Sequence, residues 1–234
     1  VESLIRKAEL GMYKQKVKSS HSTHHQLRKR YDLPDLDSTM KGENFMIADL
    51  IKKNRTYRRF VESERISEEQ LRKWVDLARI TSSGMNNQPL KYYLSWEEKT
   101  NTLIFPHLRW AGYLKDWSGP SEGERPAAYL VMLGDTEISK NVWWDHGLAA
   151  QSILLGAVEE GYGGCMFGSI DRPALAQALA LDDKYEILMV IALGKPLEKI
   201  VLEPLKPEGD IKYYRDEEQV HHVPKRGLDD IIVK

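Results

Sequence analysis

The stretch YEILMVIALG, residues 185–194, is apolar at nearly every position. A second such run, AAYLVMLG, occupies residues 127–134. Near-continuous apolar runs of this length are typical of central strands that are covered on both faces. The two runs therefore predict the central strands of a sheet that lies between layers of helices.

Helical patterns flank these two runs. Residues 142–160 lie between them and predict one long helix, with Gly161 placed to end it. Ser67 and Gln70 have the spacing of a capping box, and apolar residues at helical spacing follow them. These helices would cover the central strands.

Two shorter apolar runs are separated by the polar residues EEKTN. The runs are KYYLSW, residues 91–96, and TLIF, residues 102–105, and they predict a β-hairpin. Together with the central runs they indicate an α+β fold, in which a mostly antiparallel central sheet is sandwiched by helices.

The composition is that of a globular protein with its own core. The chain has 234 residues and a mass of 27.0 kDa; 41% of the residues are hydrophobic, 29% are charged, and the mean hydropathy is −0.50. No apolar run reaches the roughly 18 residues of a membrane span, and the first residues lack the layout of a signal peptide. We therefore expect a cytoplasmic protein without a membrane partner.

Charge and cysteine content exclude several function classes. Lys and Arg number 34 against 35 Asp and Glu, so the net charge of −1 provides no basic field for a nucleic acid. Cys165 is the single cysteine, which leaves no intrachain disulfide and no Cys-x-x-Cys pair for a metal or redox site. We expect no metal site, and any redox chemistry must come from a bound cofactor.

Residues 1–45 differ in texture from the rest of the chain. They carry nine basic and six acidic residues and few apolar side chains after Val17. From Met46 onward the apolar patterns become regular. We therefore predict an N-terminal arm over residues 1–45 and one compact domain over residues 46–234.

The segment Asn54-Arg55-Thr56-Tyr57-Arg58-Arg59-Phe60 concentrates three guanidinium groups and the hydroxyl group of Thr56. The arginine fork matches phosphate oxygens, and Thr56 can donate a further hydrogen bond, so the segment is a candidate anion site. The alternative is an exposed basic turn that pairs with the glutamates at positions 62, 64, 68 and 69.

The loop SSGMNNQP, residues 82–89, combines small residues with two asparagines and a glutamine. Such a loop offers amide donors and acceptors without bulk, which suits the edge of a planar heterocycle. The alternative is an ordinary connecting turn.

Glycines dominate residues 161–168, GYGGCMFG, but they do not form a dinucleotide-binding loop. The G-x-G-x-x-G register fails at Met166, and the segment follows a helix rather than a strand. Paired glycines instead allow backbone N–H groups to approach a flat ligand closely. Cys165 lies here without a nearby histidine in sequence, so it could serve as a nucleophile only with a distant partner.

Five segments of the chain, taken together and in their order along the sequence, resemble motifs of the FMN-dependent nitroreductase family. The likeness extends from about Met46 to Val233 and departs from the common pattern at Asn54, Ser82 and Leu90, where many members have arginine, proline and tryptophan. The five segments are RTYRRF (55–60), SSGMNNQP (82–89), DHGLAAQSILLGAVEEGYGG (145–164), IALGKP (191–196) and HHVPKR (221–226).

The resemblance implies a role for each matching residue. Arg55 and Thr56 would hold the FMN phosphate, joined by Lys225 or Arg226, and Arg58 would reach the pyrimidine side of the flavin ring. A cation there would favour the reduced flavin. Family members are intertwined homodimers, so the resemblance implies that Ser83, Asn86 and Gln88 contact the flavin from the second subunit. Gly163 and Gly164 would contact the ring through their backbone N–H groups.

The resemblance also implies the reaction. NAD(P)H would reduce FMN and leave, and an oxidised acceptor such as a nitroaromatic or a quinone would then take the electrons, in a ping-pong mechanism. No catalytic side chain is expected, because the flavin carries the chemistry. The alternatives are a flavin-binding module without rapid turnover and a relative of the reductive dehalogenases.

Residues 110–117, WAGYLKDW, suggest a substrate lid. Trp110, Tyr113 and Trp117 can stack on a flat acceptor, and glycine and proline residues follow them. The same three residues also fall at helical spacing, so the alternative is a segment of plain core.

Overall fold

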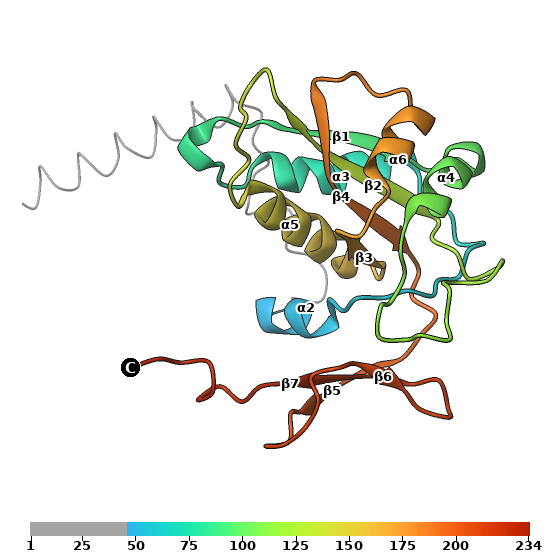
Figure 1. Ribbon diagram of the computed structural model, residues 1–234, viewed down its shortest axis with the longest axis vertical. Coiled ribbons are helices and arrows are strands. Elements are labelled where there is room, and N and C mark those ends of the chain that lie inside the picture. The colour runs from blue at the N-terminus through green and yellow to red at the C-terminus, as the bar shows by residue number, and fades with distance from the viewer. Residues whose placement is uncertain (1–45) are drawn as a thin grey trace, which may run out of the picture. The chain divides into compact units, whose positions relative to one another are not determined.

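The computed structural model describes residues 46–234 (Figure 1). The arm expected over residues 1–45 lies outside the described residues. The central feature is a four-stranded sheet in the order β1-β2-β4-β3, in which every neighbouring pair is antiparallel. Its strands are β1 (Leu90–Ser95), β2 (Ala128–Asp135), β3 (Gly163–Phe167) and β4 (Tyr185–Gly194).

The two central strands are those predicted from the longest apolar runs. Strand β2 is buried at all of its positions, and β4 occupies the run YEILMVIALG from end to end. Because side chains alternate along a strand, β2 sends Leu130 and Met132 to one face of the sheet and Tyr129 and Val131 to the other. Strands buried on both faces need a layer on each side, which the helices supply.

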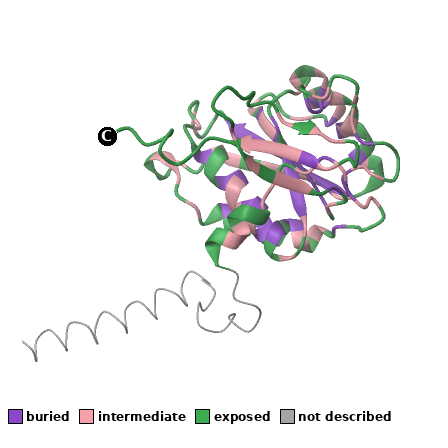
Figure 2. Cartoon of the chain, turned by 90° about the horizontal axis from the view of Figure 1, so that it is seen from below, coloured by how far each residue is buried: buried purple, intermediate pink, exposed green. Residues whose placement is uncertain are grey.

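Helices cover both faces of the sheet, so the predicted sandwich is confirmed. On one face α3 (Glu68–Arg79) and α5 (Asp145–Glu159) pack through Trp74 and Ile153 against Leu130. On the other face α4 (Glu98–Ile104) and α6 (Arg172–Ala178) pack through side chains that include Ile104 and Leu175. Figure 2 shows the buried residues concentrated in the sheet and on the inner faces of the helices.

The helix ends follow the sequence signals. Ser67 and Gln70 form the predicted capping box, with the Gln70 amide donating to the Ser67 hydroxyl oxygen at 3.2 Å. Helix α5 begins at Asp145, three residues later than predicted, and Gly161 follows its end at a φ of 77°, a conformation that favours glycine.

The predicted hairpin is wrong in its second half. Residues 98–104 form helix α4, and the short 3-10 helix η2 (Phe105–His107) follows it. Asn101 and Ile104, one helical turn apart, both face the interior, and the Asn101 amide donates to the Ala127 carbonyl at 2.9 Å. A short apolar run such as TLIF fits a buried helix turn as well as a strand. Positions 101 and 104 share one face of a helix but would face opposite sides of a strand, so the burial of both fits the helix.

A second, three-stranded sheet follows β4. It contains β5 (Ile200–Pro204), β6 (Tyr214–Arg215) and β7 (His221–Lys225) in the order β5-β7-β6, with β5 and β7 parallel. We call it the C-terminal sheet, and Figure 1 shows it in red near α2 (Ile47–Lys53). The sequence patterns do not predict this sheet.

Candidate functional site

The predicted anion-binding segment runs directly beside strand β3. Helix α2 ends at Lys53, and Thr56 then pairs with Gly164 in a parallel bridge, while the Tyr57 amide donates to the Gly164 carbonyl at 3.0 Å. The structure thus brings together two segments that the sequence analysis singled out separately, around Arg55 and around Gly163.

The paired glycines allow this close approach. A Cβ atom on Gly163 would lie 2.5 Å from the Tyr57 ring, and one on Gly164 would lie 2.5 Å from the Ala192 carbonyl oxygen. Neither position therefore accepts a larger residue without displacing its neighbours. Packing accounts for both glycines, and contact of their N–H groups with a flavin stays a prediction.

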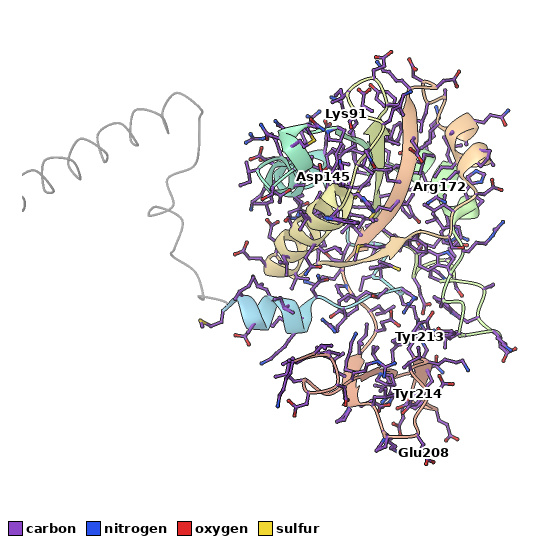
Figure 3. The ribbon with its side chains drawn as sticks, turned by 60° about the vertical axis from the view of Figure 1, so that its left-hand side comes forward. Lys91, Asp145, Arg172, Glu208, Tyr213 and Tyr214 are labelled. Atoms are coloured by element: carbon purple, nitrogen blue, oxygen red, sulfur yellow. The ribbon has the colours of Figure 1, made fainter. Side chains whose placement is uncertain are left out.

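Arg58 is buried and its guanidinium group meets the C-terminal sheet. The guanidinium carbon lies 4.6 Å from the centre of the Tyr213 ring, labelled in Figure 3, and Nη1 lies 3.3 Å from His221 Nε2. Nη1 also donates to the Thr56 carbonyl at 3.4 Å. Within residues 46–234 the Arg58 side chain forms no ion pair, so its positive charge is not neutralised by a carboxylate.

Arg55 and Thr56 lie nearer the surface. Arg55 Nη2 donates to the Ile51 carbonyl at 2.6 Å, whereas Arg55 Nε is buried and has no hydrogen-bond partner among the described residues. Thr56 is exposed. Lys225 and Arg226, at the end of β7 and beyond it, are also exposed.

The alternative of a basic turn paired with nearby glutamates does not describe Arg55 or Arg58. In the described part of the chain Glu68 pairs with Arg72, and Glu62 accepts hydrogen bonds from backbone amides. Among residues 46–234, Arg59 is the one member of the cluster that forms an ion pair, with Glu124. Two of the three guanidinium groups therefore remain available to an anion.

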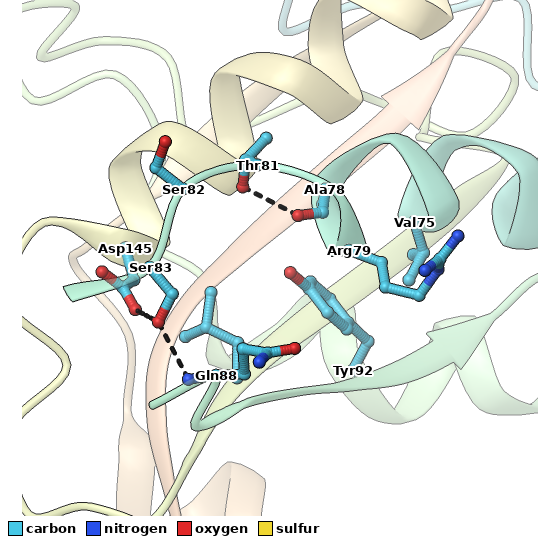
Figure 4. Close-up of a pocket in the computed structure, with 10 residues that line it drawn as sticks. Val75, Ala78, Arg79, Thr81, Ser82, Ser83, Gln88, Tyr92 and Asp145 are labelled. Atoms are coloured by element: carbon cyan, nitrogen blue, oxygen red, sulfur yellow. Dashed lines mark hydrogen bonds between the residues drawn. The ribbon is translucent and has the colours of Figure 1, made fainter. Parts of the chain in front are cut away.

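The amide-rich loop is anchored to the start of α5 (Figure 4). The Ser83 hydroxyl donates to the Asp145 carboxylate at 2.6 Å, the Gly84 amide donates to it at 2.8 Å, and the Gln88 amide donates to the Ser83 hydroxyl oxygen at 2.8 Å. The loop contains η1 (Gly84–Asn86) and is strained, with positive φ at non-glycine residues Met85, Asn86 and Gln88. Its amides are thus held in a fixed arrangement.

Asp145 is a site residue to which the sequence analysis gave no role. It is buried, and it fixes the loop that carries Ser83, Asn86 and Gln88. The signal that could have found it is its place as the first residue of DHGLAAQ, inside the first turn of the helix predicted over residues 142–160.

A cavity of about 290 Å³ lies behind this loop. Tyr92 lines the cavity. Burial, and to a lesser extent the charge of Asp145, raises the pKa of Tyr92 to about 12, so its hydroxyl stays protonated at neutral pH. The volume is at the small end for a ligand pocket. Its lining residues are Val75, Ala78, Arg79, Thr81, Ser82, Ser83, Gln88, Leu90, Tyr92 and Asp145 (Figure 4).

A single chain does not unite the two halves of the candidate site. Ser83 lies at the start of α5, and Gly163 follows its end. Helix α5 has 15 residues, so it separates the two ends by about 22 Å. The amide-rich loop and the Arg55–Arg58 segment of the same chain are therefore separate half-sites.

The predicted lid residues divide between core and surface. Trp110 is buried against Phe167, with ring centres 4.6 Å apart, whereas Tyr113 is 48% exposed. Tyr113 contacts Tyr213 at 4.9 Å, and Trp117 lies under the Arg215 guanidinium at 4.4 Å. Residues 110–117 form turns rather than a helix, and their movement over a substrate stays a prediction.

Three further findings concern Cys165, metal ligation and membrane-crossing helices. Burial raises the pKa of the Cys165 thiol to about 12, which disfavours the nucleophilic thiolate. Within residues 46–234 no cluster of three or more His, Cys, Asp or Glu side chains could hold a metal ion. No helix in this described range has both the length and the apolar character needed to cross a membrane.

Comparisons with known proteins identify the same family that the motifs resemble. The family model described as "Nitroreductase family" matches residues 51–195. No curated protein matches the chain. Solved structures share the fold, and the matches to the three described below cover most of the length of each of those chains.

A nitroreductase family protein from Clostridium novyi is 24% identical, with a TM-score of 0.55, and the match covers 65% of this chain and 87% of that one. A protein from Exiguobacterium sibiricum, solved in complex with FMN, is 16% identical, with a TM-score of 0.56 and coverage of 67% and 91%. A protein from Staphylococcus epidermidis, assigned as an NAD(P)H:FMN oxidoreductase, is 15% identical, with a TM-score of 0.60 and coverage of 81% and 95%.

Proposed function

The chain belongs to the nitroreductase family, and on that premise we propose that it is a flavin oxidoreductase that binds FMN and passes electrons from NAD(P)H to an oxidised small molecule. The presence of FMN in the Exiguobacterium sibiricum protein supports the cofactor. The assignment of the Staphylococcus epidermidis protein supports NAD(P)H as the reductant. Nitroaromatics and quinones are the acceptors that we propose.

The observation that carries this proposal is the un-neutralised charge of Arg58. A buried guanidinium group without a carboxylate partner is costly unless an electron-rich ligand completes its surroundings. Arg55 adds a buried Nε without a partner among the described residues. Both donors lie on one segment beside β3, so the residues present fit an anionic cofactor such as FMN.

Each residue of this segment has a proposed role. Arg55 and the exposed hydroxyl of Thr56 would hold the phosphate, because charge-assisted hydrogen bonds to phosphate oxygens are strong and directional. Lys225 or Arg226 would add a second cation from the end of β7. Arg58 would lie beside the pyrimidine side of the flavin ring.

When bound, FMN would supply the redox chemistry, accepting a hydride from NAD(P)H and returning electrons to the acceptor. The protein's task is then to bind and orient. Arg58 would stabilise negative charge on the ring, which favours the reduced cofactor. The described residues need supply no acid or base for hydride transfer itself.

We also propose that two copies of the chain form the complete site. Ser83, Asn86 and Gln88 of a second copy would contact the flavin held by Arg55 and Arg58, because one chain keeps these half-sites apart. Exposed apolar side chains support a homodimer, since such surfaces commonly mark protein interfaces. They include Met46, Ile47 and Ile51 around α2 and Trp143, Trp144 and Leu148 around the start of α5.

Reduction of the bound cofactor tests the function directly. The purified protein should be yellow, NADH or NADPH should bleach it anaerobically, and a quinone or nitroaromatic should restore the colour. A protein that neither contains nor takes up FMN would overturn the proposal. A protein that holds FMN but is not bleached by either nucleotide would be a flavin-binding module without turnover.

A further inference from the structure

The C-terminal sheet supplies the surroundings of the Arg58 guanidinium group. Tyr213 directly precedes β6, and His221 is the first residue of β7. Their side chains contact Arg58 at 4.6 Å to the ring centre and 3.3 Å between Nε2 and Nη1. A residue from the N-terminal part of the domain is therefore oriented by residues more than 150 positions later in the chain.

Neither contact neutralises the charge of Arg58. The Tyr213 ring attracts the cation through its π face and carries no charge of its own. Arginine has no acceptor, so His221 Nε2 must accept the hydrogen bond and the ring proton lies on Nδ1. Burial, with the positive charges of Arg58, Arg215 and His222, lowers the pKa of His221 to about 4, so the ring is neutral at neutral pH.

The buried carboxylate nearby is engaged elsewhere. Glu198 accepts a hydrogen bond from the Arg58 backbone amide and forms an ion pair with Arg215 at 2.9 Å. Its charge is thus balanced by Arg215, not by the side chain of Arg58. The result is a guanidinium group that is fixed in place from several sides while its charge stays available.

We propose that Tyr213 and His221 are positioning residues that orient Arg58 toward the flavin without cancelling its charge, and that they thereby set how strongly the site prefers reduced over oxidised FMN. This inference rests on the proposed function. It assigns to the C-terminal sheet a part in the cofactor site that the motif around Arg55 does not contain.

A pair of neighbouring variants separates this role from a general effect on the C-terminal sheet. Figure 3 labels both tyrosines. Tyr213 contacts Arg58, whereas Tyr214 stacks on His222 and donates to Glu203 on its own sheet. Tyr213→Leu removes the ring beside Arg58, and Tyr214→Leu is the matched control with the same change one residue later. Tyr213→Phe retains the ring and should behave as the wild type.

The readout is the midpoint potential of bound FMN, together with the dissociation constants of oxidised and reduced FMN. We expect Tyr213→Leu to lower the preference for reduced FMN about tenfold, a size between those of an exposed and a desolvated cation–π contact. For a two-electron couple this corresponds to a potential about 30 mV more negative. Tyr214→Leu should leave the potential unchanged.

A second pair tests the hydrogen bond and covers the case in which Tyr213→Leu does not fold. His221→Gln keeps a neutral acceptor for Arg58 and should retain the wild-type potential, whereas His221→Met fills the space without an acceptor and should lower it. Thermal unfolding identifies the variants that are folded under the conditions of the titration.

The outcomes are distinguishable. If the wild-type protein binds no FMN, the proposed function fails and this inference fails with it. If the wild type binds FMN but the Tyr213→Leu and Tyr214→Leu proteins have the same potential, or His221→Met matches His221→Gln, the positioning role alone is overturned.

Discussion

Ser83 donates its hydroxyl hydrogen to the buried carboxylate of Asp145 at 2.6 Å, and this bond joins the amide-rich loop to the first turn of α5. The same hydroxyl oxygen accepts a hydrogen bond from the Gln88 amide at 2.8 Å. One side chain therefore links both ends of the strained loop to the core.

Ser83→Ala should destabilise the protein by about 1–2 kcal/mol, because it leaves a buried carboxylate oxygen and a backbone amide without a partner. Ser82→Ala is the matched control: Ser82 is exposed, and its loss should change the free energy of unfolding by less than about 0.5 kcal/mol. Urea unfolding of both variants gives the comparison. Equal effects would show that the loop is not anchored through Ser83.

Gly164→Ala should destabilise the protein by at least about 2 kcal/mol, since the new Cβ would meet the Ala192 carbonyl oxygen at 2.5 Å. Gly168→Ala provides the control, because Gly168 is exposed and no atom lies within 4 Å of a Cβ placed there. Thermal unfolding distinguishes the two. A Gly164→Ala protein as stable as the wild type would contradict the close packing of β3 against β4.

Stability should fall when the pH is lowered from 7 to 5 because of His221. Its pKa is lowered from 6.5 to about 4 in the folded protein, so between these values the unfolded chain binds a proton that the folded one does not. We expect a loss of about 2 kcal/mol from this group. Urea unfolding at both pH values should show a smaller loss in His221→Gln than in the wild type.

The neighbouring histidine supplies a control of opposite sign. A hydrogen bond to Asp216, with a second to Glu203, raises the pKa of His222. Its contribution to stability is therefore complete below about pH 6.5 and is lost as the pH rises through the raised pKa. His222→Gln should thus show a loss between pH 7 and 5 at least as large as that of the wild type. The account of His221 is wrong if the His221→Gln protein keeps the wild-type loss.

The elements that the sequence predicts best are those with long and regular patterns. Strands β2 and β4 and helix α5 bury whole runs of side chains, so their apolar patterns persist over eight or more residues. The strands of the C-terminal sheet are short and only partly buried, and β7 contains Pro224, so they lack a period that could be recognised.

The residues of the candidate site also divide into those that the sequence predicts and those that it does not. Arg55 and Arg58 can be found from local density of charge, because the signal lies within a few adjacent residues. Tyr213, His221 and Glu198 cannot, since their importance comes from tertiary contacts with a residue at least 140 positions away. The pattern of polar and apolar residues along the chain carries no information about which distant residues form such a tertiary contact.

Arg55→Ala should weaken FMN binding at least about tenfold, because it removes a charge-assisted donor whose Nε has no partner among residues 46–234. Arg59→Ala is the matched control, since the Arg59 guanidinium group is already paired with Glu124. Fluorescence titration of FMN against both variants makes the comparison. Equal affinities for FMN in the two proteins would remove Arg55 from the phosphate site.

The central claim is that this chain holds FMN on the segment beside β3, and equilibrium titration of the cofactor-free protein with FMN tests it most directly. The account predicts saturable binding of one FMN per chain, with release of the intact cofactor on denaturation. A titration in which flavin fluorescence and absorbance stay those of free FMN at every protein concentration would contradict it.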